Sequence, residues 1–179
     1  MDLDGLRDQL PAYARDIANN LSHLAAETIL TDQQKWGAFV ASAHALGVGE
    51  VVRAIEASAA EAGLSAAAMD AAKGAAAIMA MNNVYFRAVH IMENREYAAL
   101  PARLRLNILG NPGAPKIDFE LWSMAVSAIN GCGACMDSHE AELRKLGASP
   151  QQVQAALRIG AVVTAASRVV AGDAAAHGR

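Results

Sequence analysis

The chain contains two cysteines, Cys132 and Cys135, within the segment NGCGACMDSHE, and His139 follows the second cysteine by four residues. In an α-helix, residues three and four positions apart project from the same face. The two thiols and the imidazole are therefore expected to face a common site. Three interpretations fit these groups: a reversible dithiol-disulfide couple, a metal site, and a helix in which the cysteines only pack.

A dithiol-disulfide couple requires two sulfur atoms that can reach bonding distance and one thiol with a lowered pKa. Glycines on both sides of Cys132 suggest that a helix begins there, so free N–H groups and the helix dipole favour a thiolate at Cys132. His139 could exchange a proton with Cys135. Glu120 lies twelve residues before Cys132, on a preceding predicted helix that could fold back and bring its carboxylate beside His139 or Cys132.

The metal interpretation is weaker because a structural zinc site normally has four ligands. The sequence has no second cysteine pair and no H-x-x-x-H motif, so Cys132 and Cys135 would need both His139 and Glu120. In the third interpretation both cysteines pack and His139 lies on the surface. The C-x-x-C spacing with a histidine one turn later favours the redox couple over both. Methionines 79, 81, 92 and 124 are interpreted as core residues.

Composition excludes several classes of partner. The formal net charge is -3 and no run of Lys or Arg is present, so nucleic acid and anionic membranes are not expected partners. The N-terminus is acidic and lacks a signal-peptide pattern, and charged and amide residues interrupt the most apolar stretch, 66–89. A cytoplasmic protein with no membrane-spanning segment is expected. No nucleotide-binding glycine motif is present, so no tightly bound cofactor is expected.

The elements that position these groups are predicted to be helices. Strand patterns are almost absent, and a content of 54% hydrophobic but only 4% aromatic residues suits closely packed helices. We expect one all-α domain, a helical bundle over residues 1–179. The long helix after Ser65 could break near Asn82 and Asn83. Helices are predicted at about 11–27, 32–46, 50–61, 66–85, 101–107, 117–130, 132–146 and from 150 onward.

Two segments resemble each other within the chain. AIMAMNNVYFRAVH (77–90) and VSAINGCGACMDSH (126–139) are both rich in Ala and Met, reach an Asn and end in a His. The similarity suggests an internally duplicated helical hairpin. Only the second segment contains cysteines.

The segments MAMNNVYFR and NPGAPKIDFELWSMAVSAINGCGAC, with the following His-Glu, resemble the AhpD-type alkylhydroperoxidases of the carboxymuconolactone decarboxylase-like superfamily. The resemblance covers almost the whole chain and includes the pattern E-x(11)-C-x-x-C-x(3)-H. It implies an AhpD-like all-helical domain with its active site in 117–147, assembled as a homotrimer. It also implies a thiol-dependent peroxidase that re-reduces an AhpC-type peroxiredoxin, with electrons from dihydrolipoamide on a lipoyl carrier protein.

The same resemblance implies a role for each candidate residue. Cys135 would be the peroxidatic thiol, which becomes a sulfenic acid and can form a transient mixed disulfide with the peroxiredoxin. Cys132 would be the proton donor and resolving thiol that forms a disulfide with Cys135, and Glu120 and His139 would relay protons. Helix-dipole reasoning instead favours Cys132 as the first thiolate. In addition, some relatives carry a histidine between the cysteines, where this chain has Gly133-Ala134.

Two other functions stay open from the sequence. One is a non-redox, carboxymuconolactone decarboxylase-like enzyme, which would not use the thiols. The other is a helical zinc-binding or scaffold module, in which bound zinc would replace the redox chemistry.

Overall fold

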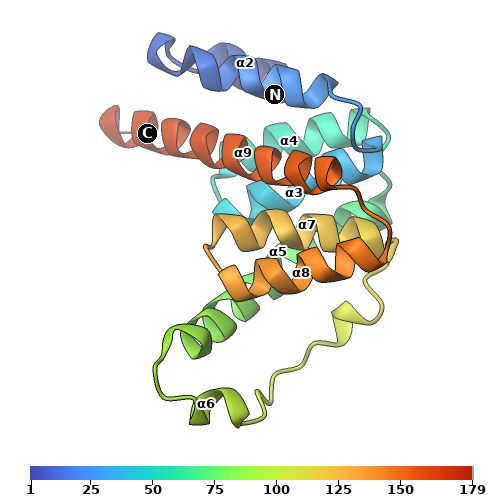
Figure 1. Ribbon diagram of the computed structural model, residues 1–179. Coiled ribbons are helices and arrows are strands. Elements are labelled where there is room, and N and C mark those ends of the chain that lie inside the picture. The colour runs from blue at the N-terminus through green and yellow to red at the C-terminus, as the bar shows by residue number, and fades with distance from the viewer. Residues whose placement is uncertain (179) are drawn as a thin grey trace.

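The computed structural model describes residues 1–178, and every regular element in this range is a helix (Figure 1). The predicted all-α class is confirmed. The α-helices are α1 (Leu3–Gln9), α2 (Arg15–Ala26), α3 (Asp32–Leu46), α4 (Gly49–Glu61), α5 (Ala66–Ile91), α6 (Glu96–Ala99), α7 (Lys116–Ile129), α8 (Gly133–Lys145) and α9 (Pro150–Ala176), with 3-10 turns at Ala12–Ala14 and Asn107–Leu109.

Helices α3 and α7 form the centre of the bundle. Helix α3 packs against α5, α7 and α9, and α7 packs against α5, α8 and α9. Between α3 and α7 lies the fully buried indole of Trp122, whose Nε1–H donates to the carbonyl oxygen of Gln34 at 3.0 Å. A Cβ on Gly37 would lie 2.2 Å from the Trp122 ring. The glycine therefore makes room for the indole and fixes α7 against the bundle.

Local capping contacts close several helix ends. Thr31 caps α3 in a reciprocal capping box with Gln34, and Gly47 follows the helix with a φ of 70°. Ser149 forms the same box with Gln152 at the start of α9, with a proline in the first turn. These short-range hydrogen bonds satisfy the free N–H groups of the first turns.

The N-terminal region and α5 differ from the prediction. Helix α1 was not expected, and Pro11 precedes a 3-10 turn rather than opening α2, which begins at Arg15. Helix α5 runs unbroken through Asn82 and Asn83, so the expected break there is wrong. Both amides are buried, and Asn83 is bonded to side chains of another helix, so tertiary contacts outweigh the low helix propensity of Asn.

The predicted helix at 101–107 is wrong. Residues 101–106 contain no regular helix, and short helical turns instead flank them at α6 and Asn107–Leu109. Pro101 cannot donate a backbone hydrogen bond and restricts the residue before it. Arg103 adopts a φ of 51°, outside the helical region.

The two similar segments, 77–90 and 126–139, differ in local structure. The first lies entirely within α5, whereas the second spans the end of α7, a turn and the start of α8. Helix α5 packs against both α7 and α8, so the two segments meet in space although they do not share a conformation.

Between α5 and α7, the connecting segment 92–115 projects away from the bundle (Figure 1). The part of this segment that leads back to the bundle packs closely against α5. A Cβ on Gly74 would lie only 2.6 Å from the Ile108 side chain. Several large apolar side chains on this segment and the adjoining part of α5 are exposed: Val84, Ile91, Met92, Tyr97 and Leu100. Met92 was predicted to be a core residue, and that prediction is wrong.

By length and composition, α9 could span a membrane, and it is the one helix among residues 1–178 that meets this criterion. The sequence prediction had considered only 66–89 as a candidate span. In the fold α9 packs against α2, α3 and α7. Its apolar side chains Val153, Ile159 and Val163 are buried in the core.

Replacing Gly37 with Ala is expected to destabilise the protein by about 1–3 kcal/mol, because the new methyl group would overlap the Trp122 ring. Urea denaturation followed by far-UV circular dichroism measures the loss. Gly172→Ala in α9 is the matched control, because a Cβ there meets nothing within 4 Å and alanine favours a helix by about 0.5–1 kcal/mol. Equal stability of the two variants would contradict the close packing at Gly37.

Candidate active site

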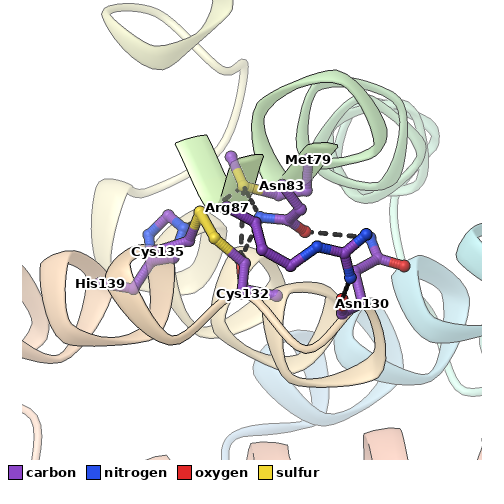
Figure 2. The surroundings of a disulfide bond; sticks show 8 residues. Met79, Asn83, Arg87, Asn130, Cys132, Cys135 and His139 are labelled. Carbon is purple, nitrogen blue, oxygen red and sulfur yellow. Dashed lines mark hydrogen bonds between the residues drawn. A yellow bond between two sulfur atoms is a disulfide. The ribbon is translucent and has the colours of Figure 1, made fainter. Parts of the chain in front are cut away.

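Cys132 and Cys135 are joined by a disulfide at the start of α8, with their Cα atoms 5.2 Å apart (Figure 2). Cys132 is the N-cap residue, and Cys135 lies in the first turn. The tight turn from α7 is possible because Gly131 adopts a φ of 67°, and it is closed by the Cys132 N–H, which donates to the Ser127 carbonyl at 3.0 Å. The predicted start of a helix at the cysteines is confirmed.

Glu120 of α7 lies beside His139 of α8. Its Oε2 is 2.7 Å from the imidazole Nδ1, and the two side chains are only 13% and 12% exposed, respectively. The sequence left open whether Glu120 would approach His139 or Cys132, and in the fold it is bonded to His139. A carboxylate accepts a hydrogen bond, so Nδ1 carries a proton and Nε2 is the ring atom that can gain or lose one.

Met79 of α5 contacts the other side of the imidazole. Its Sδ lies 3.3 Å from His139 Nε2 and 3.6 Å from the hydroxyl oxygen of Ser127. Met79 is buried, as predicted for a core residue, but its contact with His139 was not foreseen. A thioether has no hydrogen to donate and is only a weak acceptor, so it contacts Nε2 without occupying it and would bind a proton there only weakly.

A chain of polar contacts ties the turn before Cys132 to α5. The Asn83 amide nitrogen donates to Ser127 Oγ at 2.9 Å, and its Oδ1 accepts from the Asn130 amide at 2.9 Å. Arg87 donates to the carbonyl oxygen of Asn130 (Figure 2). These bonds place the end of α7, the turn and therefore the cysteines at a fixed position relative to α5.

A cavity of about 310 Å³ lies between α5, α8 and the 3-10 turn at Asn107–Leu109. This volume is at the lower end of the range for small-molecule sites, roughly 300–1,000 Å³. Its lining is mainly apolar. The lining residues are Met79, Asn82, Phe86, Leu106, Leu109, Ala134, Cys135, Ser138 and His139.

The two cysteines are not equivalent toward this cavity. Cys135 lines it and is 7% exposed, whereas Cys132 is fully buried and is not among the lining residues. Ala134, which lies between them, contributes a methyl group to the wall. A small molecule in the cavity would therefore meet the sulfur of Cys135 first.

The other histidines in the described chain do not line this cavity. His44 is bonded to Glu56 of α4 at 2.8 Å, and Lys73 pairs with the same carboxylate. The hydrogen bond from Lys73 lowers the pKa of Glu56, and the bond with His44 adds to the effect. Among residues 1–178, no three or more His, Cys, Asp and Glu side chains are grouped so that they could hold a metal ion.

The chain is similar to known proteins, both in the region of the site and over almost its whole length. The profile of the carboxymuconolactone decarboxylase family matches residues 95–178, which contain all four predicted site residues. Alkyl hydroperoxide reductase AhpD of Hyphomonas neptunium is 59% identical, over 98% of this chain and 97% of its own. The AhpD proteins of Maricaulis maris and Caulobacter vibrioides are 60% and 55% identical, covering 97% and 99% of this chain and 99% and 97% of their own lengths.

Burial predicts that the two thiols of the reduced protein differ in reactivity. In single-cysteine variants, iodoacetamide should alkylate Cys135 in Cys132→Ser about tenfold faster than it alkylates Cys132 in Cys135→Ser, because only Cys135 lines the cavity. Intact-mass spectrometry over time measures both rates. The unfolded variants in urea serve as the control and should react equally. Faster alkylation of Cys132 in the folded protein would contradict the assignment.

Proposed function

Because this chain belongs to the AhpD family of alkyl hydroperoxide reductases, we propose that it reduces organic hydroperoxides through a dithiol-disulfide cycle of Cys135 and Cys132. The position of the disulfide supports this function most directly. One of its sulfur atoms belongs to a residue that lines a small apolar cavity, and His139, bonded to Glu120, lines the same cavity. An apolar cavity suits the organic group of the peroxide.

In the first step, His139 Nε2 takes the proton of the Cys135 thiol, and Glu120 stabilises the resulting imidazolium through Nδ1. The Cys135 thiolate attacks the distal oxygen of the hydroperoxide. A sulfur–oxygen bond forms, the oxygen–oxygen bond breaks, and the leaving alkoxide receives a proton from Cys132. The products are an alcohol, the Cys135 sulfenic acid and the Cys132 thiolate.

In the second step, the Cys132 thiolate attacks the sulfenic sulfur of Cys135. The disulfide forms, and the departing hydroxide takes the proton held by His139 and leaves as water. A dithiol then restores both thiols by exchange, through attack on one sulfur of the disulfide. We propose dihydrolipoamide on a lipoyl carrier protein as this reductant, with no tightly bound cofactor.

The choice of Cys135 as the attacking thiol follows from access. The helix dipole acts on both cysteines, because Cys132 is the N-cap residue and Cys135 lies in the first turn of α8. Only Cys135 lines the cavity, so access of the substrate favours Cys135 as the attacking thiol. Ala134 leaves no second imidazole between the cysteines, so His139 is the one imidazole in the cycle, and Cys132 supplies the proton for the leaving alkoxide.

The same exchange chemistry would serve a protein partner. The reduced pair can transfer its electrons to the disulfide of an AhpC-type peroxiredoxin through a transient mixed disulfide at Cys135, the more accessible sulfur. Reversible thiol chemistry of this kind belongs to a reducing cytoplasm, which is the proposed location.

The projecting segment 92–115 supports assembly into a homotrimer. Val84, Ile91, Tyr97 and Leu100 expose large apolar side chains on this segment and the adjoining end of α5. Several large apolar side chains exposed on neighbouring elements are typical of an interface between protein chains. A neighbouring copy would cover these side chains.

The proposed cycle predicts that Cys135→Ser abolishes turnover of cumene hydroperoxide with dihydrolipoamide, because no thiolate reaches the cavity. His139→Gln and Glu120→Gln should slow turnover by about 100-fold or more, since the base or its partner is removed. Oxidation of NADH coupled through dihydrolipoamide dehydrogenase measures the rates.

Glu140→Gln is the matched control for Glu120→Gln, because Glu140 lies on α8 with a side chain that is 54% exposed and should be dispensable. Wild-type turnover in Cys135→Ser would exclude the thiol cycle. Full activity after alkylation of both cysteines would favour the non-redox decarboxylase-like function.

For the assembly, light scattering is expected to give three times the chain mass of 18.6 kDa. Leu100→Asp should dissociate the trimer, because Leu100 is 61% exposed on the projecting segment and a buried, unpaired carboxylate is costly at an apolar interface. Tyr13→Asp, which changes an exposed side chain on the 3-10 turn before α2, is the control and should stay trimeric. A monomeric wild-type protein at micromolar concentration would contradict the proposal.

A further inference from the structure

The side chain of Asn82 is a buried amide in the wall of the cavity that Cys135 also lines. Asn82 is 5% exposed, and its Oδ1 is fully buried without a hydrogen bond. Its Nδ2 is not among the fully buried unpaired atoms, so Nδ2 is the end of the amide that keeps accessible surface. Buried amides are normally satisfied, since an unpaired polar group destabilises the folded state. An amide in a cavity wall whose accessible Nδ2 has no protein acceptor therefore points to a ligand that accepts a hydrogen bond.

The neighbouring Asn83 shows what a structural amide looks like in the same helix. It is 1% exposed and is bonded at both ends, to Ser127 and to Asn130. Asn82 lies about 100° further round α5, on the stripe that also carries Met79 and Phe86. All three residues of that stripe line the cavity, opposite Cys135 and His139 of α8.

The polar groups of the cavity indicate the class of ligand. Apart from Cys135 and His139, the polar lining side chains are Asn82 and Ser138, and neither Lys nor Arg is among the lining residues. Arg87, one turn beyond Asn83, donates to the Asn130 carbonyl instead. The cavity therefore suits a neutral ligand that both donates and accepts hydrogen bonds. A hydroperoxide with an apolar organic group has this character.

We propose that Asn82 binds the peroxide group of the substrate and presents it to Cys135. The Asn82 Nδ2–H, at the end of the amide that is not fully buried, donates to the proximal oxygen of the hydroperoxide. The organic group lies against Phe86, Leu106 and Leu109. This proposal rests on the proposed function and assigns it a substrate-contacting residue outside the C-x-x-C segment.

The amide would also contribute to the reaction itself. When the thiolate attacks the distal oxygen, the oxygen–oxygen bond breaks and negative charge develops on the proximal oxygen. A donor already aimed at that atom stabilises the charge as it forms, in a site with little water. The same contact fixes which oxygen faces the sulfur.

The test uses Asn82→Leu, which keeps the side-chain size and removes both hydrogen-bonding atoms. It measures two half-reactions separately: oxidation of the thiols by the peroxide and reduction of the disulfide by the dithiol. The reduced variant is mixed with cumene hydroperoxide and the remaining thiols are counted over time. The oxidised variant is separately mixed with dihydrolipoamide. Oxidation by the peroxide should slow by about 10- to 100-fold, whereas reduction of the disulfide should stay within about twofold of wild type, since exchange with a dithiol does not use the amide.

Thermal unfolding gives a second readout. Asn82→Leu should unfold at the same temperature as wild type or higher, because it removes an unpaired buried amide, whereas Asn83→Leu should unfold at a lower temperature, because it breaks two buried bonds. Asn82→Asp, which lacks the donor, should also slow oxidation if the leucine variant does not fold. Asn20→Leu on α2, exposed to solvent, should match wild type in both half-reactions.

Each other outcome has a defined meaning. Wild-type oxidation rates in Asn82→Leu and Asn82→Asp would overturn the role of Asn82 while leaving the thiol cycle intact. Equal slowing of both half-reactions would also overturn it, because that pattern indicates a distorted disulfide. If the wild-type protein itself does not react with the hydroperoxide, the proposed function fails, and the role of Asn82 falls with it.

Discussion

The bridge from Asn83 to Ser127 and Asn130 is the interaction on which the site depends. It joins the middle of α5 to the last turn of α7 and to the residue before Gly131. The turn that follows determines where α8 begins and thus where both sulfur atoms lie. Because the Asn83–Ser127 bond is buried, water cannot replace it at low cost. Cysteine placement is therefore a property of the helix packing as much as of the C-x-x-C segment.

Much of the site could be predicted because its residues lie close together in the sequence. Cys132, Cys135 and His139 share one helix, so spacing alone brought them together. The approach of Glu120 could be predicted as well, because one tight turn separates its helix from the helix of the cysteines and His139. The starts of α3 and α9 could be predicted for the same reason, since the capping box at each start is completed within four residues.

The contribution of α5 could not be predicted from the residues alone. Met79, Asn82 and Asn83 lie about fifty residues before the cysteines, and no local pattern distinguishes an amide that bridges helices from one that breaks a helix. Two Asn residues in succession were accordingly interpreted as a weak point of α5. The fold shows the opposite, because buried contacts compensate for their low helix propensity. The helix predicted around Pro101 was wrong for another reason, because Pro101 lacks a backbone N–H and Arg103 adopts a φ of 51°.

The cavity has two walls of different origin. One wall, with Cys135 and His139, belongs to the tightly packed bundle, whereas Leu106 and Leu109 come from the projecting segment. Substitutions at Leu106 or Leu109 would thus reshape the space for an organic group without moving the disulfide or its proton partners. Selectivity and reactivity are in this sense modular: new specificities could evolve on the projecting segment while the redox centre stays unchanged.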